Sequence, residues 1–243
     1  MALGITQVRV MPEPRVAILS TGDEVVSPEQ QPAPGQVRDV NSYTLGALVS
    51  RSGGQPIRYG IIGDSAGELE AAARRAHSEA NLVVIAAGSS VSARDITADV
   101  ISRLGEPGIL VHGVSIRPGK PTVLAVCAGV PVIGLPGNPV SAFVVAGLFL
   151  LPAVRKLLGL RGPLWPAVMQ ARLTSNVSST TGREDYLPVR LEVTPEGLLA
   201  VPVHGRSNLI FTLVRADGLV RIPAEATGLE AGTTVEVRLF QDG

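Results

Sequence analysis

Short apolar runs alternate with amphipathic segments along the first two thirds of the chain. A run of β-branched residues predicts a strand buried on both faces, whereas apolar residues recurring every three or four positions predict a helix. The expected strands are residues 15–20, 55–62, 82–87, 109–116, 122–129 and 130–135, and the expected helices are residues 41–52, 67–80, 96–105 and 140–158. Strands that alternate with such helices are typical of βαβ units. We therefore expect an α/β fold with a doubly wound, largely parallel sheet.

The pattern changes after Leu160. The proline-rich junction RGPLWPA is followed from Val168 by short alternating strands, and turn signals such as PEG and ADG separate them. Short alternating strands separated by turns are typical of a small all-β domain. The expected organisation is a linker or remnant of an upstream domain over residues 1–14, an α/β domain over 15–161 and a β domain over 162–243.

Charge and composition exclude several classes of partner. Lysine plus arginine and aspartate plus glutamate number 21 each, so no net field attracts nucleic acid or a membrane surface. Aromatic residues make up only 3% of the chain, which disfavours stacking platforms for single strands. The sequence contains one cysteine, Cys127, in an apolar run, so we expect an inert buried thiol.

No N-terminal secretory signal is evident, and we expect a cytoplasmic location. The most apolar run, Val140–Leu151, ends at Pro152. A membrane span needs about 20 apolar residues, so this segment is predicted to be a core helix and no membrane partner is expected.

Polar, glycine-rich segments follow four of the predicted strands. Ligands of open α/β sheets bind beyond the carboxyl ends of the strands, so these segments are expected to share one edge. They are Thr21-Gly22-Asp23-Glu24, Gly88-Ser89-Ser90-Val91-Ser92-Ala93-Arg94-Asp95, Arg117-Pro118-Gly119-Lys120 and Pro136-Gly137-Asn138-Pro139. Each also has an ordinary structural interpretation: Ser89 and Ser90 as turn residues, Asp95 as a helix N-cap, Asp23 and Glu24 as solvated turn charges. Four such segments at one sheet edge favour a site.

The residue types suit a phosphate-bearing ligand. Serine hydroxyls and backbone N–H groups cradle phosphate oxygens, and Arg117 and Lys120 supply positive charge. Glu24 and Asp95 are candidate ligands of a divalent cation such as Mg²⁺. Three histidines, His77, His112 and His204, show no metal-ligand spacing and are expected to be structural or exposed.

The segment GLPGNPVSA, residues 134–142, joins a strand to the long apolar helix. Asn138 is a favoured N-cap residue, and Pro139 suits the first helical position because its missing N–H is not needed there. The helix start then presents free N–H groups and a positive dipole end to an anion. The alternative is an ordinary capped turn. Asn41 is likewise expected to cap the helix over residues 41–52.

Several motifs together resemble one known family. The strings PRVAILSTGDEVV, RDVN, GSSVSARD, IRPGKP and GLPGNPVSA occur in this order, and GRED, HGRSN and LVRADGLVRIP follow in the β-rich part. Over essentially residues 5–240 the chain resembles the C-terminal part of the molybdopterin molybdenumtransferases, the MoeA and gephyrin E-domain family. The family's pterin-binding fold and C-terminal β domain agree with the architecture expected above.

The resemblance implies a transferase of molybdenum cofactor biosynthesis. Such enzymes insert molybdenum from molybdate into molybdopterin, act on the adenylylated pterin and release AMP. It implies Mg²⁺ or another divalent cation, a homodimer, and molybdopterin adenylyltransferase as a further candidate partner. Two alternatives remain: a non-catalytic molybdopterin-binding module that senses or carries the cofactor, and an adenylyltransferase of the same pterin-binding fold, which the extra β domain disfavours.

The motifs also imply residue roles. Glu24, Asp95 and Lys120 match catalytic positions, and Glu24 and Asp95 are the expected metal ligands. The residues expected around molybdate are Arg117, Lys120, Arg183 and Ser207. The residues expected to bind the pterin substrate are Thr21, Gly22, Asp23, Asp39, Asn41, Gly88, Ser89, Ser90, Ser92, Pro136, Gly137, Asn138 and Pro139. Arg183 has an alternative role as an ion-pair partner of Glu184 or Asp185.

The chain departs from the family pattern at several positions. Ser89-Ser90 stand where the family has a glycine pair, Arg94 stands for a glycine, and the loop to Asp95 is two residues shorter. Arg117 replaces a lysine, which keeps the charge and changes its geometry. The family's two preceding domains, which help to close the site across a dimer, do not occur in this sequence. We therefore expect pterin binding with weak activity.

Overall fold

The computed structural model describes residues 2–88, 91–161 and 168–240. Its first part is a six-stranded sheet with the order β4-β1-β5-β9-β8-β6. The strands are β1 (Arg15–Thr21), β4 (Gln55–Ile62), β5 (Leu82–Ala86), β6 (Pro107–His112), β8 (Val123–Cys127) and β9 (Val130–Leu135). β4, β1, β5 and β9 pair in parallel, and β8 runs antiparallel to both of its neighbours. The predicted largely parallel sheet is confirmed.

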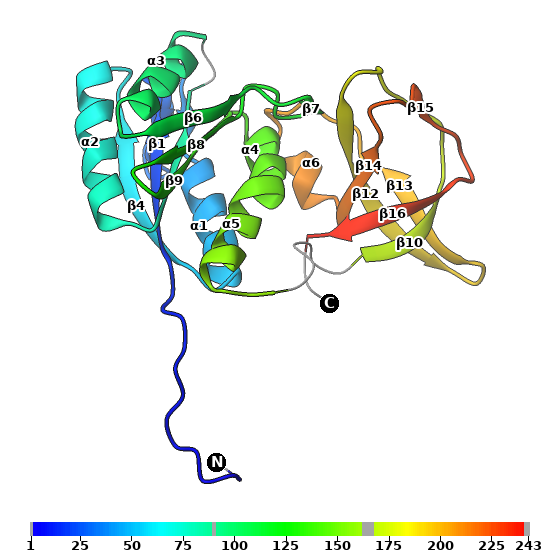
Figure 1. The fold of residues 1–243 in the computed structure, drawn as a ribbon. Helices are drawn as coiled ribbons and strands as arrows, with labels where there is room; N and C mark the ends of the chain where they lie inside the picture. Colours follow the sequence, from blue (N-terminus) through cyan, green and yellow to red (C-terminus); the bar gives the residue numbers. More distant parts are fainter. Residues whose placement is uncertain (1, 89–90, 162–167, 241–243) are drawn as a thin grey trace.

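Helices cover both faces of this sheet (Figure 1). On one face, α1 (Asn41–Arg51) and the long helix that starts at Pro139 pack over the side chains of Val16 and Ile18. On the other, α2 (Ala66–Glu79) and α3 (Val91–Ser102) belong to the core that contains Ala17 and Leu19. Successive residues of a strand point to opposite faces, so β1 contributes to both cores and has no polar face.

The long helix consists of α4 (Pro139–Val145), a π-helical segment η1 (Ala146–Leu150) and α5 (Leu151–Leu157). The π segment ends two residues before Pro152, which has no N–H to donate and whose ring crowds the preceding turn of an α-helix. By length and composition, residues Pro139–Leu157 are apolar enough to cross a membrane. Their inward face is nevertheless buried in the protein core.

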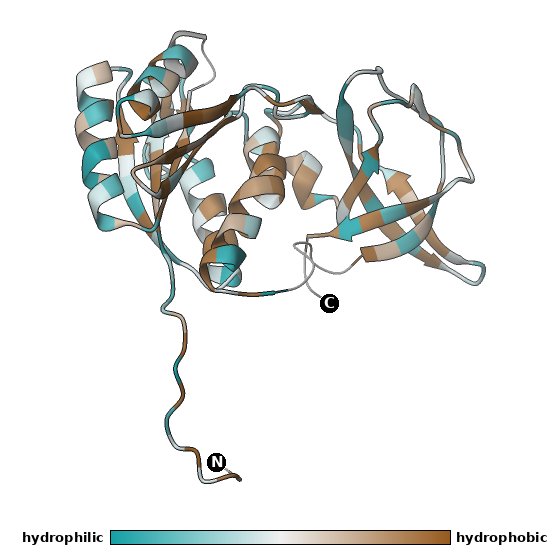
Figure 2. Ribbon diagram, viewed as in Figure 1, coloured by the Kyte–Doolittle hydropathy of each residue, from teal (hydrophilic) through white to brown (hydrophobic). Residues whose placement is uncertain are grey.

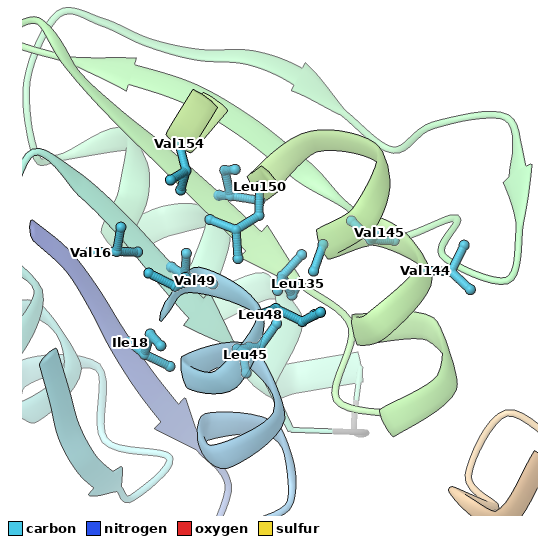
Figure 3. Close-up of a cluster of buried hydrophobic side chains, with 14 of the residues drawn as sticks. Val16, Ile18, Leu45, Leu48, Val49, Leu135, Val144, Val145, Leu150 and Val154 are labelled. Carbon is cyan, nitrogen blue, oxygen red and sulfur yellow. The ribbon is translucent and has the colours of Figure 1, made fainter. Parts of the chain in front are cut away.

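Figure 3 shows this packing in detail. Val144, Val145, Leu150 and Val154 of the long helix belong to the same buried cluster as Leu45, Leu48 and Val49 of α1, and the six residues other than Leu48 have no exposed surface. Figure 2 shows the complementary hydropathy pattern, in which hydrophobic residues concentrate on the central strands and hydrophilic residues are prominent on α2.

The second part of the chain forms a closed five-stranded barrel. Its strands are β10 (Val168–Leu173), β12 (Glu184–Thr194), β13 (Gly197–Pro202), β14 (Gly218–Ile222) and β16 (Thr234–Leu239). They follow the order β13-β10-β16-β14-β12, and β12 also pairs with β13, which closes the ring. Short two-stranded pairs join β11 (Val177–Ser178) to β15 (Gly228–Leu229) and β2 (Val25–Val26) to β3 (Val37–Arg38).

The two parts are packed together and share secondary structure. Strand β7 (Ile116–Arg117) belongs to the first part by sequence, yet it pairs in parallel with β12 of the barrel. Tyr186, Leu213 and Leu219 of the second part belong to the core cluster beneath the long helix. The short helix α6 (Phe211–Val214) also lies in this region, where the sequence shows no helical periodicity, because a single turn is too short to produce one.

Several element boundaries differ from the sequence predictions. The predicted strand over residues 109–116 is wrong in extent, because β6 spans Pro107–His112, residues 113–115 form no strand, and β7 begins at Ile116. The expected helix over residues 96–105 begins earlier, at Val91, and ends at Ser102. Residues 2–14 form neither helix nor strand and extend away from the domain in Figure 1. All of the described side chains in this segment except Pro14 are exposed.

Candidate functional site

The carboxyl ends of β1 and β5 are joined by a side-chain hydrogen bond. The N–H of Gly88, which follows β5, donates to Oγ1 of Thr21 at the end of β1, over 3.3 Å. Thr21 is buried, and Gly22 next to it has a φ of +135°, a conformation that favours glycine. A side chain at Gly22 would also meet the carboxylate of Glu24. Two of the four predicted loops therefore lie side by side.

Three carboxylates gather beyond β1 and β4. The N–H of Asp64, after β4, donates to Oδ1 of Asp23 over 2.9 Å. Burial raises the pKa of the Asp64 carboxyl, and the negative charges of Asp23 and Glu24 act in the same direction. Asp64 was not among the residues predicted for the site, although the GDS segment follows the carboxyl end of β4 in the same way as the predicted loops follow their strands.

Asp39 and Asn41 both make contacts inside the chain. The Asp39 carboxylate accepts hydrogen bonds from Ser20 Oγ, from the Ser42 N–H and from Ser42 Oγ, over 3.0, 3.1 and 2.6 Å. It therefore satisfies the start of α1, and the prediction that Asn41 caps this helix is wrong. A residue two positions before Asn41 performs that role. The Asn41 side chain instead donates to the carbonyl of Gly137 over 2.8 Å and fixes the turn before α4.

The GLPGNP turn positions the start of the long helix as predicted, with Asn138 in the N-cap position and Pro139 first in the helix. Within the described residues, however, the Asn138 side chain makes no capping hydrogen bond. The N–H of Val140 donates to the carbonyl of Ser207, from the barrel part, over 3.0 Å. The helix start is therefore partly satisfied by the second part of the chain rather than left open to a ligand. Pro136 is buried, and Gly137 is half-buried.

A cleft of about 1380 Å³ lies between the two parts of the chain. Its lining includes all four residues predicted to surround molybdate, which are Arg117, Lys120, Arg183 and Ser207. Asn138 lines the same cleft. Further polar residues that were not assigned to a site from the sequence line the cleft as well, among them His112, Asn176, Thr180, Thr181, His204 and Arg206. Among the described lining residues Asp185 is the only acidic one, so the cleft is cationic.

A hairpin between β6 and β8 carries two of these cations into the cleft. The N–H of Val114 donates to the carbonyl of Lys120 over 2.9 Å, and Thr122 Oγ1 donates to the carbonyl of Gly119 over 2.6 Å. Gly119 has a φ of +122° and packs against the long helix so closely that a side chain would overlap Val145. The PGK turn is thereby fixed, and Lys120 remains exposed to the cleft.

Arg117 and Arg183 meet at one buried carboxylate. Nη1 of Arg117 lies 3.5 Å from Asp185 Oδ2, and Nε of Arg183 donates to Asp185 Oδ1 over 3.1 Å. The exposed fractions of these side chains are 61% for Arg117, 37% for Arg183 and 10% for Asp185. The alternative role of Arg183 as an ion-pair partner is therefore observed together with its position in the cleft.

Asp95 lies in the second turn of α3, so its interpretation as a helix N-cap is wrong. It lines a smaller pocket of about 170 Å³ that shares His112 and Pro121 with the cleft. Ser89 and Ser90 fall outside the described residues, and Ser92 belongs to α3 but its side chain is not described. In residues 2–88, 91–161 and 168–240, no group of three His, Cys, Asp or Glu side chains is close enough to hold a metal ion. The Glu24–Asp95 metal site stays a prediction.

The expected inert thiol and structural histidine are observed. Cys127 is buried, and burial raises the pKa of its thiol. A nitrogen of His77 lies 2.8 Å from the carbonyl of Cys127, which ties α2 to the end of β8. His112 and His204 differ from His77 because both line the cleft.

Comparison with known proteins gives two family matches that together cover most of the chain. Residues 17–156 match the family described as "Probable molybdopterin binding domain", and residues 170–240 match "MoeA C-terminal region (domain IV)". A molybdopterin molybdenumtransferase from Nostoc is 36% identical over 95% of this chain and 54% of its own length. Molybdopterin molybdenumtransferase 1 from Mycobacterium tuberculosis is 34% identical over 97% of this chain and 57% of its own length.

Among solved structures, a molybdopterin biosynthesis MoeA protein from Pyrococcus horikosii superposes with a TM-score of 0.86 and 39% identity. The match covers 99% of this chain and 57% of that protein. The chain thus spans little more than half the length of these relatives. Its two matched regions correspond to the sheet with its helices and to the barrel.

Proposed function

Because this chain belongs to the family of molybdopterin-binding domains that continue into the MoeA C-terminal region, we propose that it binds a molybdopterin substrate and a molybdate-type oxyanion. The pterin binds at the carboxyl ends of the sheet strands, and the oxyanion binds in the cleft. Within a complete enzyme, these sites insert molybdenum into adenylylated molybdopterin and release AMP. The observation that carries the proposal is the convergence of Arg117, Lys120, Arg183 and Ser207 on one cleft.

The chemistry of the cleft suits a tetrahedral dianion. An oxyanion requires several charge-assisted donors that converge on it, and arginine offers paired N–H groups while lysine offers a point charge. Each guanidinium retains further N–H groups beyond its contact with Asp185, because Arg183 uses Nε and Arg117 uses Nη1 for that contact. The Ser207 hydroxyl supplies a neutral donor from the barrel side of the cleft.

The pterin side of the site is built mainly from backbone and hydroxyl groups. Thr21, Gly22 and Gly88 lie together at the ends of β1 and β5. Gly137 is tied to Asn41 beside the start of the long helix, where Asn138 lines the cleft. The glycines in these loops carry no side chain, so a ligand can approach the backbone closely. In this proposal Asp23, Asp39, Pro136, Pro139 and the Ser89, Ser90 and Ser92 segment complete the pterin site.

A divalent cation is part of the proposed site, with substrate phosphates among its ligands, because no group of three His, Cys, Asp or Glu side chains in the described residues lies close enough to hold it alone. The raised pKa of Asp64 reflects burial and the unfavourable proximity of Asp23 and Glu24. A cation such as Mg²⁺ removes this repulsion and prefers such oxygen ligands together with substrate phosphates. We propose that Glu24 and Asp95 hold it together with the phosphate oxygens of the substrate, and its role when bound is to neutralise charge on those phosphate groups. A homodimer, contact with a molybdopterin adenylyltransferase and a cytoplasmic location stay predictions.

Tungstate is expected to bind in the cleft in contact with Arg117, Lys120, Arg183 and Ser207. It has the shape and charge of molybdate, so the same convergent donors hold it. Anomalous diffraction from crystals soaked in tungstate locates the ion directly. Density elsewhere, or none at a saturating concentration, would overturn the oxyanion assignment.

Replacement of Lys120 by alanine is expected to weaken binding of molybdopterin by roughly tenfold or more, about 1.4 kcal/mol, because the cleft loses a fixed positive charge. Calorimetric titration of the wild-type and variant proteins measures the change. Lys156→Ala is the matched control, because Lys156 lies in the last turn of α5, away from the cleft lining. Equal affinities of a folded Lys120→Ala variant and the wild type would remove Lys120 from the site.

A further inference from the structure

Asp185 is a nearly buried carboxylate at the junction of the two parts of the chain. Its residue exposure is 7%, and its two oxygens contact arginines from different parts: Arg117 from the β6–β8 hairpin and Arg183 from the barrel. In the sequence Asp185 stands in the GRED segment, which marks it only as one of two candidate ion-pair partners of Arg183.

The charge balance explains why a carboxylate occupies this position. Two guanidinium groups directed into one cleft repel each other, and that repulsion is stronger where water is partly excluded. A buried carboxylate in turn is costly without partners, and both arginines compensate it. The three side chains therefore stabilise one arrangement. One nitrogen of each guanidinium contacts Asp185, and the other N–H groups remain available to a ligand in the cleft.

Backbone pairing places Asp185 where both arginines reach it. Asp185 on β12 is the register partner of Arg117 on β7, and the adjacent N–H of Glu184 donates to the carbonyl of Ser115 over 2.9 Å. Because β7 is the only strand that the first part adds to the barrel sheet among the described residues, this pairing links domain packing to the position of Arg117.

We propose that Asp185 is a positioning residue for the oxyanion. It holds Arg117 and Arg183 in a fixed fork that spans the two parts of the chain, so oxyanion affinity depends on the docked arrangement of the barrel. This inference rests on the proposed function of the cleft and deepens it. Asp185 itself does not contact the oxyanion, because carboxylate and oxyanion repel each other.

The test compares two neighbouring substitutions that remove the same charge. Asp185→Asn is expected to weaken tungstate binding by at least tenfold. The asparagine side chain has one acceptor oxygen for one guanidinium, whereas its NH₂ group faces the other guanidinium, which has donors only. Glu184→Gln is the matched control, since Glu184 contacts Arg221 and Tyr186 instead of the cleft arginines, and its affinity is expected to stay within twofold of the wild type. Calorimetry with tungstate provides the affinities, and circular dichroism and thermal unfolding establish that each variant is folded.

Two further variants distinguish a positioning role of Asp185 from a purely structural one. Asp185→Glu keeps the charge and displaces it by one methylene, so it is expected to fold and to bind tungstate with intermediate affinity. In an Arg183→Ala background, the loss caused by Asp185→Asn is expected to shrink to less than threefold, because one of the two arginines that it positions is gone. An undiminished tenfold loss there would show that Asp185 acts independently of Arg183 and would overturn the proposal.

The outcomes also distinguish this inference from the proposed function. If the wild type itself binds no tungstate, the oxyanion function of the cleft fails and the role of Asp185 fails with it. If the wild type binds and both Asp185 variants bind equally well, only the positioning role is overturned.

Discussion

The 243-residue chain is expected to bind the pterin but to insert molybdenum at least a hundredfold more slowly than a full-length relative. Proximity and exclusion of water supply a large part of the rate of such reactions, with effective molarities on the order of 10⁵ M or more in well-oriented sites. Here the cleft is open: the Arg117 side chain is 61% exposed, and Lys120 is exposed as well. Water therefore screens the charges that stabilise the reacting groups.

The chain spans 54% of the Nostoc transferase and 57% of the Mycobacterium tuberculosis enzyme. The measurement is AMP release and activation of an apo-molybdoenzyme in the presence of adenylylated molybdopterin, molybdate and Mg²⁺. A full-length relative assayed in parallel is the positive control. Rates equal to that control would contradict the prediction and show a complete enzyme. Pterin binding without any turnover would favour the alternative of a non-catalytic binding module.

Substitution of Gly119 by alanine is expected to destabilise the fold by roughly 2 to 5 kcal/mol, from backbone strain together with overpacking. The φ of +122° at this position disfavours any side chain. An added Cβ would also lie 2.5 Å from Cγ2 of Val145 and 3.0 Å from Cδ1 of Ile116. Val145 is completely buried in the long helix.

Urea unfolding of the wild type and Gly119→Ala measures the loss, and Gly182→Ala is the matched control. Gly182 has a φ of +91°, but no described atom lies within 4 Å of an added Cβ, so only the conformational term of about 1–2 kcal/mol applies. Equal losses for the two variants would show that the contact with Val145 is unimportant. Gly119→Ala is further expected to weaken tungstate binding relative to the wild type, because it displaces the turn that carries Lys120.

Local sequence pattern was sufficient for most of the elements around the site. The apolar runs before Thr21, Gly88 and Pro136 are strands in the structure, and the glycine- and proline-rich segments follow them at the carboxyl ends. The long helix begins at Pro139 and continues to Leu157, within one residue of its predicted end. These features depend on periodicity and on turn residues close together in the chain, which a single sequence displays directly.

Individual hydrogen-bond partners were less predictable, even at helix ends. Asn41 has the composition of an N-cap, yet Asp39 performs that role, because the β3 segment ahead of α1 brings its carboxylate back over the Ser42 N–H. The side chain of Asn41 is thereby free to reach Gly137, on a different loop of the sheet. Asp39 and Asn41 are close in sequence, and each has a side-chain oxygen that can cap a helix. Only the path of the backbone decides which of the two does so.

The sequence by itself determined most of the alternating strands and helices, the change to a β-rich second part and three of the cationic residues around the cleft, which are Arg117, Lys120 and Arg183. Only the tertiary structure decided that Asp64 joins Asp23 and Glu24, and that Arg117 and Arg183 share Asp185. Both groupings arise from strands that are distant along the chain and adjacent in space, through the pairing of β1 with β4 and of β7 with β12. Strand pairing depends on which faces of the sheet are buried and on the register between strands, and a local stretch of residues specifies neither.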